Sequence, residues 1–256
     1  MDDTSVEERT RAVAQAEASD EMHRPEVVDP VVDFLAARAE GGRVLELGIG
    51  SGRIALPLAA RGVEVHGIDL SEDAVAALRS RPGGEALPVT IGDFASTPVD
   101  GRPFGLAYLV FNTIMNLTTQ DEQVACFQTV AAQLEPGGRF VIETMIPELR
   151  RLPPGETIKP FHFSAERWGF DEYDVADQGL RSHHVVIRDG RLEYSSGPFR
   201  YVWPAELDLM AKLSGMRLVE RWDGFAGEPF TSESRQHVSV WLKPIDTPPD
   251  PGRGRR

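Results

Sequence analysis

The sequence predicts an α/β protein built around a mainly parallel sheet. From residue 43 to 144, short apolar runs alternate with stretches of helical periodicity, which is typical of successive βαβ units. After residue 150 the runs change to longer strands around Asp189 and Gly190, a dipeptide suited to the two-residue turn of an antiparallel hairpin. With 256 residues, of which 41% are hydrophobic and 26% charged, the chain is long enough to bury one large core.

Net charge and cysteine content narrow the class of protein. The chain has 27 Lys and Arg against 40 Asp and Glu, a formal charge of -13 that repels phosphate backbones, so we expect no nucleic-acid partner. No apolar run approaches the roughly 18 residues that span a bilayer, and the acidic start differs from a secretory signal. We therefore expect a cytoplasmic protein without membrane association. The single cysteine, Cys126, predicts a free buried thiol.

The chain divides into an arm, one domain and a tail. Residues 1–24 carry few large apolar groups and predict an N-terminal arm, and the proline-rich residues 244–256 predict a disordered tail. Within the domain, residues 25–243, we expect a lid insertion at about 150–203. A first helix is predicted over residues 25–40 by valines and a leucine at three- and four-residue steps. The parallel strands are predicted by five apolar runs: RVLELG, VEVHGID, LPVTIGD, LAYLVF and RFVIET.

Two of the helices between these strands carry clear local signals. Thr119 and Glu122 have the spacing of a capping box, and the apolar face that follows predicts a helix ending at Pro136. Pro57 lies inside the helix expected after Gly52. Because proline lacks an amide donor, we expect that helix to be irregular near its first turn.

The predicted hairpin fixes the positions of two neighbouring histidines. With a turn at residues 189–190, Val185 faces Tyr194, His183 shares their face, and His184 lies on the other face. Adjacent strand residues point to opposite faces and cannot chelate one ion together, so we expect no metal site. Either histidine is a candidate for accepting a proton from a substrate, although a purely structural role is more common.

A helix and two strands complete the predicted fold. The helix begins at Pro204, buries Leu207, Met210 and Leu213, and ends at Gly215. The strands are MRLVERW and QHVSVWL. Four aromatic residues are candidates for an apolar substrate pocket or, more commonly, for the core: Trp168, Tyr173, Trp203 and Phe225.

The most informative stretch is VLELGIGSG, a strand that runs directly into Gly48, Gly50 and Gly52. Glycines at this position let the backbone approach a bound molecule, and the amides at the start of the next helix favour negative charge. The dinucleotide fingerprint requires its third glycine at position 53, where this chain has Arg53. The spacing therefore argues against a nicotinamide dehydrogenase.

Acidic residues end the next two strands. Asp69, in HGIDLS, lies 21 residues after Gly48, the usual offset for a carboxylate that binds ribose hydroxyls. Asp93 and Phe94, in GDF, are suited to the amino group and the face of an adenine. Because the carboxyl ends of parallel strands meet at one edge of a sheet, the pattern predicts a ligand that contains adenosine.

The segments ELGIGSG, GIDLS, GDF and LEPGGRFVIET, in this order, resemble the class I S-adenosylmethionine-dependent methyltransferases. The resemblance is strong over residues 43–144. Residues 204–242 resemble the last antiparallel pair of that family, and the hairpin resembles the lid sheet of its small-molecule and peptide N-methyltransferases. The resemblance implies a Rossmann-like, seven-stranded, mostly parallel sheet with an inserted antiparallel lid. It also implies S-adenosyl-L-methionine as cofactor.

The resemblance assigns part of the cofactor to the glycine loop and to the second strand. It places Gly48, Gly50 and Gly52 beside the methionine moiety, Glu46 near the amino group of that moiety, and Asp69 on the ribose. The alternative for Glu46 is a structural carboxylate that caps nearby amides.

The adenine and the sulfonium are assigned to later strand ends. The resemblance places Leu70 and Phe94 on the two sides of the adenine, Asp93 on its amine, and Asn112 beside the sulfonium and the substrate entrance. The alternatives are ordinary core positions for Leu70 and Phe94 and a turn residue for Asn112. No catalytic residue is assigned, because methyl transfer mainly requires positioning.

The implied activity is methyl transfer to a nitrogen or oxygen of a small molecule or short peptide. The acidic surface favours a neutral or cationic acceptor. The alternative function is that of a noncatalytic S-adenosylmethionine-binding regulatory or partner subunit. The sequence does not indicate an oligomeric state.

Overall fold

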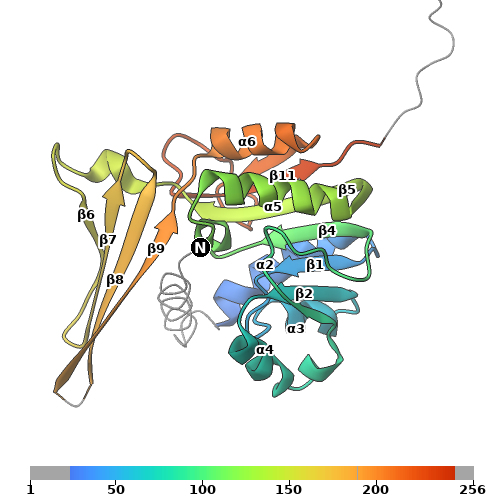
Figure 1. Ribbon diagram of the computed structural model, residues 1–256, viewed down its shortest axis with the longest axis horizontal. Helices are drawn as coiled ribbons and strands as arrows, with labels where there is room; N and C mark the ends of the chain where they lie inside the picture. The colour runs from blue at the N-terminus through green and yellow to red at the C-terminus, as the bar shows by residue number, and fades with distance from the viewer. Residues whose placement is uncertain (1–23, 189, 246–256) are drawn as a thin grey trace, which may run out of the picture.

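A computed structural model describes residues 24–188 and 190–245 and contains two sheets. The predicted arm and tail therefore lie almost entirely outside the described residues. Figure 1 shows the smaller sheet standing out to one side of the larger one. Within the described part of the chain, no helix is long and apolar enough to cross a membrane.

The larger sheet has seven strands in the order β10-β11-β5-β4-β1-β2-β3. All neighbouring strands pair in parallel except β11, which runs antiparallel to both β5 and β10. This arrangement confirms the predicted Rossmann-like fold. The strand bounds are β1 Val44–Leu47, β2 Val65–Asp69, β3 Val89–Ile91, β4 Phe104–Leu109, β5 Leu134–Met145, β10 Arg217–Trp222 and β11 Gln236–Leu242.

Helices cover both faces of this sheet. One apolar cluster combines Phe127 of α5 and Met210 of α6 with Leu45 of β1, and the other combines Leu35 of α2 with the neighbouring Val44. Because adjacent strand residues point to opposite faces, these two clusters lie on opposite sides of the sheet. The helix bounds are α2 Pro25–Ala39, α3 Ala55–Ala60, α4 Glu72–Arg79, α5 Gln120–Gln133 and α6 Pro204–Leu213.

The local helix signals are confirmed with small differences at the ends. The capping box of Thr119 and Glu122 is present, and α5 ends at Gln133, before Pro136, because β5 starts directly after it. Helix α3 is only six residues long, and Pro57 is its third residue, where its missing amide would have no helical partner.

One predicted core position is wrong. Helix α6 buries Leu207 and Met210 as expected, but the side chain of Leu213 is 70% exposed. Leu213 is the last residue of the helix and follows Ala211, the last residue that the helix buries.

The smaller sheet is the predicted lid, with the strand order β6-β7-β8-β9 and antiparallel pairing throughout. Val185 pairs with Tyr194 and Arg188 with Arg191, which confirms the predicted hairpin register. The turn residue Asp189 lies outside the described residues. The strand bounds are β6 Ile158–Phe163, β7 Arg167–Asp174, β8 Gly179–Arg188 and β9 Arg191–Arg200.

Candidate cofactor and acceptor site

The glycine loop after β1 has a backbone that other residues rarely adopt. Gly48, Gly50 and Gly52 all have positive φ, at 74°, 52° and 80°. A Cβ on Gly52 would lie 2.3 Å from the Leu78 Cδ1 atom of α4, and a Cβ on Gly48 would lie 2.9 Å from the Thr113 methyl group. These two glycines therefore allow the loop to pack closely against α4 and against the segment that follows β4.

The carboxylate of Asp69 ties this loop to the end of β2. Its Oδ2 atom accepts the Gly50 amide at 2.7 Å, and its Oδ1 atom accepts the Ser71 amide at 2.8 Å. The Ser71 hydroxyl in turn caps α4 by accepting the Ala74 amide. Because an ionised carboxylate has about four acceptor sites, Asp69 can accept further hydrogen bonds from a ligand.

Glu46 is a buried acidic residue of β1. Glu46 is 5% exposed and pairs in register with Tyr108 of the neighbouring strand β4. Burial and the Glu46 carboxylate raise the pKa of Tyr108 well above its usual range. Glu46 is therefore part of the packing between β1 and β4.

The two predicted adenine contacts differ in exposure. Leu70 is 49% exposed directly after β2, whereas Phe94 is 9% exposed and belongs to the apolar cluster under α5. Asp93 accepts the Ala95 amide at 2.9 Å, which holds the turn after β3. The nearby Cys126 is a free buried thiol, as expected.

Asn112 joins the end of β4 to the end of β5. Its Oδ1 atom accepts the Met145 amide at 2.7 Å and the Thr144 hydroxyl at 3.2 Å. Asn112 is therefore a turn residue, but its side chain accepts hydrogen bonds from β5 and not from its own backbone. Asn112 and Phe111 both have left-handed φ, at 61° and 57°, a conformation that costs energy in residues other than glycine and is concentrated at functional sites.

Glu143, on β5, supports the Phe111–Asn112 turn, a role that the sequence analysis did not identify. Its buried carboxylate accepts the Phe111 amide and supports the strained turn. Burial raises the pKa of Glu143 to about 7, although the amides of Phe111 and Asn112 and the charge of Arg53 oppose the shift. The guanidinium of Arg53 lies 3.7 Å from the centre of the Phe111 ring. The only signal for Glu143 in the sequence was its position as an acidic residue near the end of a buried strand.

A pocket of about 600 Å³, here called the acceptor pocket, opens between this turn and the lid. Phe111 and Asn112 line it from the larger sheet, and Phe161, Tyr173 and Phe199 line it from the smaller one. This volume is typical of small-molecule sites.

His184 lines the acceptor pocket and belongs to a polar chain across the lid. Its Nε2 atom lies 3.3 Å from the Ser182 hydroxyl, and Ser182 hydrogen-bonds to Asp171, its partner on β7. Burial and the charges of Arg167 and His183 lower the pKa of His184. Burial raises the pKa of Asp171 to about 6, and the neighbouring Glu148 carboxylate adds to this shift.

His183 points to the other face of the lid, as the register predicts. Its ring stacks on Phe170 with centroids 4.6 Å apart, and its Nδ1 atom lies 2.7 Å from the Tyr194 hydroxyl. Of the two candidate histidines, only His184 lines the acceptor pocket.

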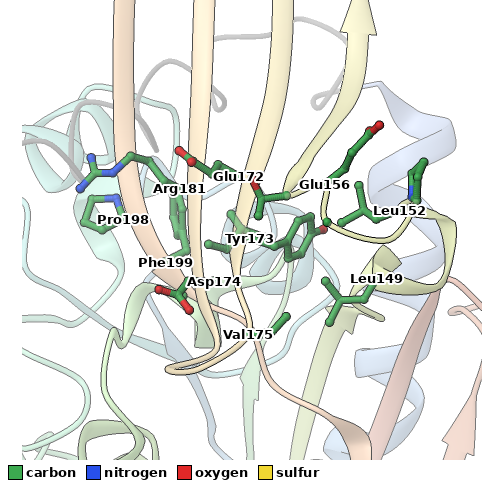
Figure 2. A pocket seen from close by; sticks show the side chains of 15 residues that line it. Leu149, Leu152, Glu156, Glu172, Tyr173, Asp174, Val175, Arg181, Pro198 and Phe199 are labelled. Carbon is green, nitrogen blue, oxygen red and sulfur yellow. The ribbon is translucent and has the colours of Figure 1, made fainter.

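A second hollow, of about 820 Å³, lies at the base of the lid. Figure 2 shows Leu149 and Leu152 on one side of Tyr173, with Arg181 and Pro198 on the other. Tyr173 also lines the acceptor pocket, so its ring forms part of the wall of both hollows.

The other three aromatic candidates line neither pocket. Trp168 stacks on Phe163 in the lid, with ring centroids 6.1 Å apart. Trp203 packs against the core, and Phe225 contacts Phe34 edge-on. Among the described residues, no group of three or more His, Cys, Asp or Glu side chains is arranged to hold a metal ion.

The chain is similar to several known proteins in sequence and in structure. Residues 44–138 match the family described as a methyltransferase domain. The CcbJ methyltransferase from Streptomyces caelestis is 37% identical, with a TM-score of 0.76 over 84% of this chain and 89% of that one. A cypemycin N-terminal methyltransferase from a Streptomyces species is 24% identical over 78% of this chain and 83% of its own length.

A third similar protein has the same fold at lower identity. CalS10, an amino pentose methyltransferase from Micromonospora echinaspora, is 22% identical, with a TM-score of 0.67 over 91% of this chain and 96% of that one. The chain belongs to the methyltransferases of the class I fold family, and it is an enzyme.

Proposed function

We propose that the protein transfers a methyl group to a nitrogen of a small molecule or short peptide bound in the acceptor pocket. The observation that carries this proposal is the position of that pocket, between the Phe111–Asn112 turn and the His184 side of the lid. An N-terminal methyltransferase among the similar proteins supports nitrogen over oxygen.

The residues at the strand ends fit the cofactor. Asp69 retains acceptor sites for ribose hydroxyls, and Asp93 retains sites for the adenine amine. Leu70 exposes an apolar side chain beside Asp69 that an adenine would cover. We place Gly48, Gly50, Gly52 and Glu46 near the methionine moiety, and Asn112 near the sulfonium. The bound cofactor supplies a methyl group that is already activated.

The polar chain of the lid supplies a proton acceptor. When the Ser182 hydroxyl donates to Asp171, the Ser182 oxygen can accept a hydrogen bond from His184 Nε2. The neutral His184 ring then carries its proton on Nε2, and its Nδ1 atom is unprotonated. An acceptor ammonium has to lose a proton before its nitrogen can attack, and His184 with a lowered pKa is neutral near pH 7. We therefore assign His184 as the base and Asp171 as the residue that sets its tautomer through Ser182.

A methyl-transfer assay tests the proposal. The protein is incubated with isotope-labelled S-adenosylmethionine and pools of small amines and short peptides, and products heavier by one methyl group are located by mass spectrometry. His184→Gln is expected to lower kcat at least tenfold without changing cofactor affinity, while the matched variant His183→Gln changes kcat less than twofold.

Three outcomes would contradict the proposal. Methylation found only on oxygen contradicts the nitrogen acceptor, and equal losses in the two histidine variants contradict the assigned base. Cofactor binding without any labelled small molecule or peptide, together with a changed activity of a partner protein, supports the noncatalytic alternative. The cytoplasmic location and the absence of a nucleic-acid partner stay predictions.

A further inference from the structure

We infer that the methyl acceptor carries a carboxylate or phosphate group, which binds to Arg151, Lys159 and Arg235 at the rim of the acceptor pocket. The inference rests on the proposed function, because it takes this pocket as the acceptor site. We name these three residues the cationic rim.

The cationic rim converges on a single carboxylate. Arg151 Nη1 lies 3.4 Å and Arg235 Nε 3.9 Å from Glu148 Oε1, and Lys159 Nζ lies 3.4 Å from Glu148 Oε2. One carboxylate cannot neutralise three cations. Asp171, the cross-strand partner of Lys159, is the only other carboxylate lining the described pocket.

The charge of the pocket is opposite to that of the chain. Four cationic side chains line the pocket, Arg53 and the cationic rim, against the two carboxylates of Glu148 and Asp171. The chain as a whole has 27 basic and 40 acidic residues. The expectation of a neutral or cationic acceptor came from the average charge, whereas a ligand responds to the charges that surround its own site.

The cationic rim is assembled by the fold and remains accessible. Arg151 lies at the end of the short helix Glu148–Arg151, Lys159 lies on β6, and Arg235 directly precedes β11. Their side chains are 47%, 28% and 67% exposed, so a ligand can reach each of them. Arginine presents a planar set of donors that matches carboxylate and phosphate oxygens.

The pocket therefore has two chemically different ends. The strained turn at Asn112 marks the end where we place the reacting nitrogen, and the cationic rim marks the end that binds an oxyanion. The aromatic walls between them suit an apolar linker. An amino acid, a short peptide with a free carboxyl end, or an amine that bears a phosphate has this chemistry.

Four small aromatic probes test the inference without requiring turnover. Benzoate, phenyl phosphate, benzamide and benzylamine share one ring, which suits the aromatic walls, and differ in charge. Binding of each probe to the full chain is measured by ligand-observed NMR, with and without S-adenosylmethionine. We expect benzoate or phenyl phosphate to bind at least tenfold more tightly than benzamide and benzylamine, and the stronger of the two identifies the oxyanion.

Two triple variants localise the binding. Arg151→Gln/Lys159→Gln/Arg235→Gln removes the cationic rim and is expected to weaken the preferred anion at least tenfold. Arg191→Gln/Lys212→Gln/Arg217→Gln removes the same residue types at exposed positions outside the pocket and is expected to leave binding within twofold. Arg235→Lys keeps the charge and is expected to retain the anion preference. It tests the need for charge at this position even if the first triple variant does not fold.

Several results would overturn the inference. With the parent protein, equal binding of benzylamine and benzoate, or no binding of either anion, would contradict it. With the variants, an anion preference that remains after loss of the cationic rim would contradict it, and so would a preference that both triple variants lose equally. Calorimetry with S-adenosylmethionine separates this failure from failure of the proposed function. A parent protein that binds the anions but not the cofactor contradicts only the proposed function.

Discussion

The Asp69 carboxylate accepts the Gly50 amide at 2.7 Å, so the acid that ends β2 and the glycine loop that follows β1 form one hydrogen-bonded unit. The second Asp69 oxygen holds the Ser71 amide at the start of α4. Asp69 therefore shapes the loop and also presents acceptor sites to a ribose. Its substitution should affect both properties.

Asp69→Ala should lower the affinity for S-adenosylmethionine by about tenfold to a hundredfold, because each unpaired polar group costs about 1 to 3 kcal/mol. Isothermal titration calorimetry measures the affinity, and urea unfolding measures the accompanying loss of stability. Asp73→Ala, at an exposed position of α4, is the matched control. Parent-like cofactor affinity in Asp69→Ala would show that the ribose assignment is wrong.

Gly52→Ala should destabilise the protein more than Gly62→Ala. Both glycines have nearly the same φ, 80° and 84°, so each alanine bears a similar left-handed strain of about 1 kcal/mol. Only the Cβ at position 52 meets another atom, Leu78 Cδ1 at 2.3 Å, which adds about 1 to 3 kcal/mol of overpacking. Equal free energies of unfolding for the two variants in urea would refute the close packing of the loop on α4.

Methyl transfer should fall as pH is lowered through about 6. The pKa of Asp171 is raised to about 6. A protonated Asp171 can donate its proton to the Ser182 oxygen, so the Ser182 hydroxyl can donate to His184 Nε2 and Nδ1 is no longer the proton acceptor. In Asp171→Asn, this step of the pH profile should disappear, and the rate at pH 8 should be about tenfold lower. Both rates are measured with the same acceptor, so the effect of pH on the acceptor is the same in each. The ratio of the parent rate to the variant rate therefore reports the effect of pH on the enzyme. A ratio that does not change with pH would exclude this role for Asp171.

Glu143→Gln should stabilise the protein at pH 8 but not at pH 4.5. The pKa of Glu143 is raised from 4.5 to about 7 in the folded state, so between these values the folded chain binds more protons than the unfolded chain. Stability contributed by this group is therefore lost as pH rises from 4.5 to 7. The side-chain amide introduced by the substitution keeps an acceptor oxygen for the Phe111 amide without a buried charge.

The difference in unfolding free energy between Glu143→Gln and the parent should grow to as much as about 3 kcal/mol at pH 8. Thermal or urea unfolding across this pH range measures it. A difference that is constant with pH would show that Glu143 titrates normally in the folded state.

The sequence was sufficient for the elements whose signals are local. The capping box at Thr119, the strand-to-glycine transition at Gly48 and the Asp189-Gly190 turn signal each depend on neighbouring residues, and they predicted a helix start, a loop and a strand register that the structure confirms. The prediction failed at Leu213, because periodicity does not show where the packing partner of a helix ends.

The sequence by itself determined the fold and the residues at the strand ends, because strand order and the meeting of carboxyl ends follow from the βαβ pattern. The tertiary structure alone decided which side chains share the acceptor pocket. Arg53, Asp171, His184 and Arg235 come from separate elements, and their distances depend on how the lid packs against the larger sheet. Local spacing carries no information about that packing, so the charge of the pocket could differ in sign from the charge of the chain.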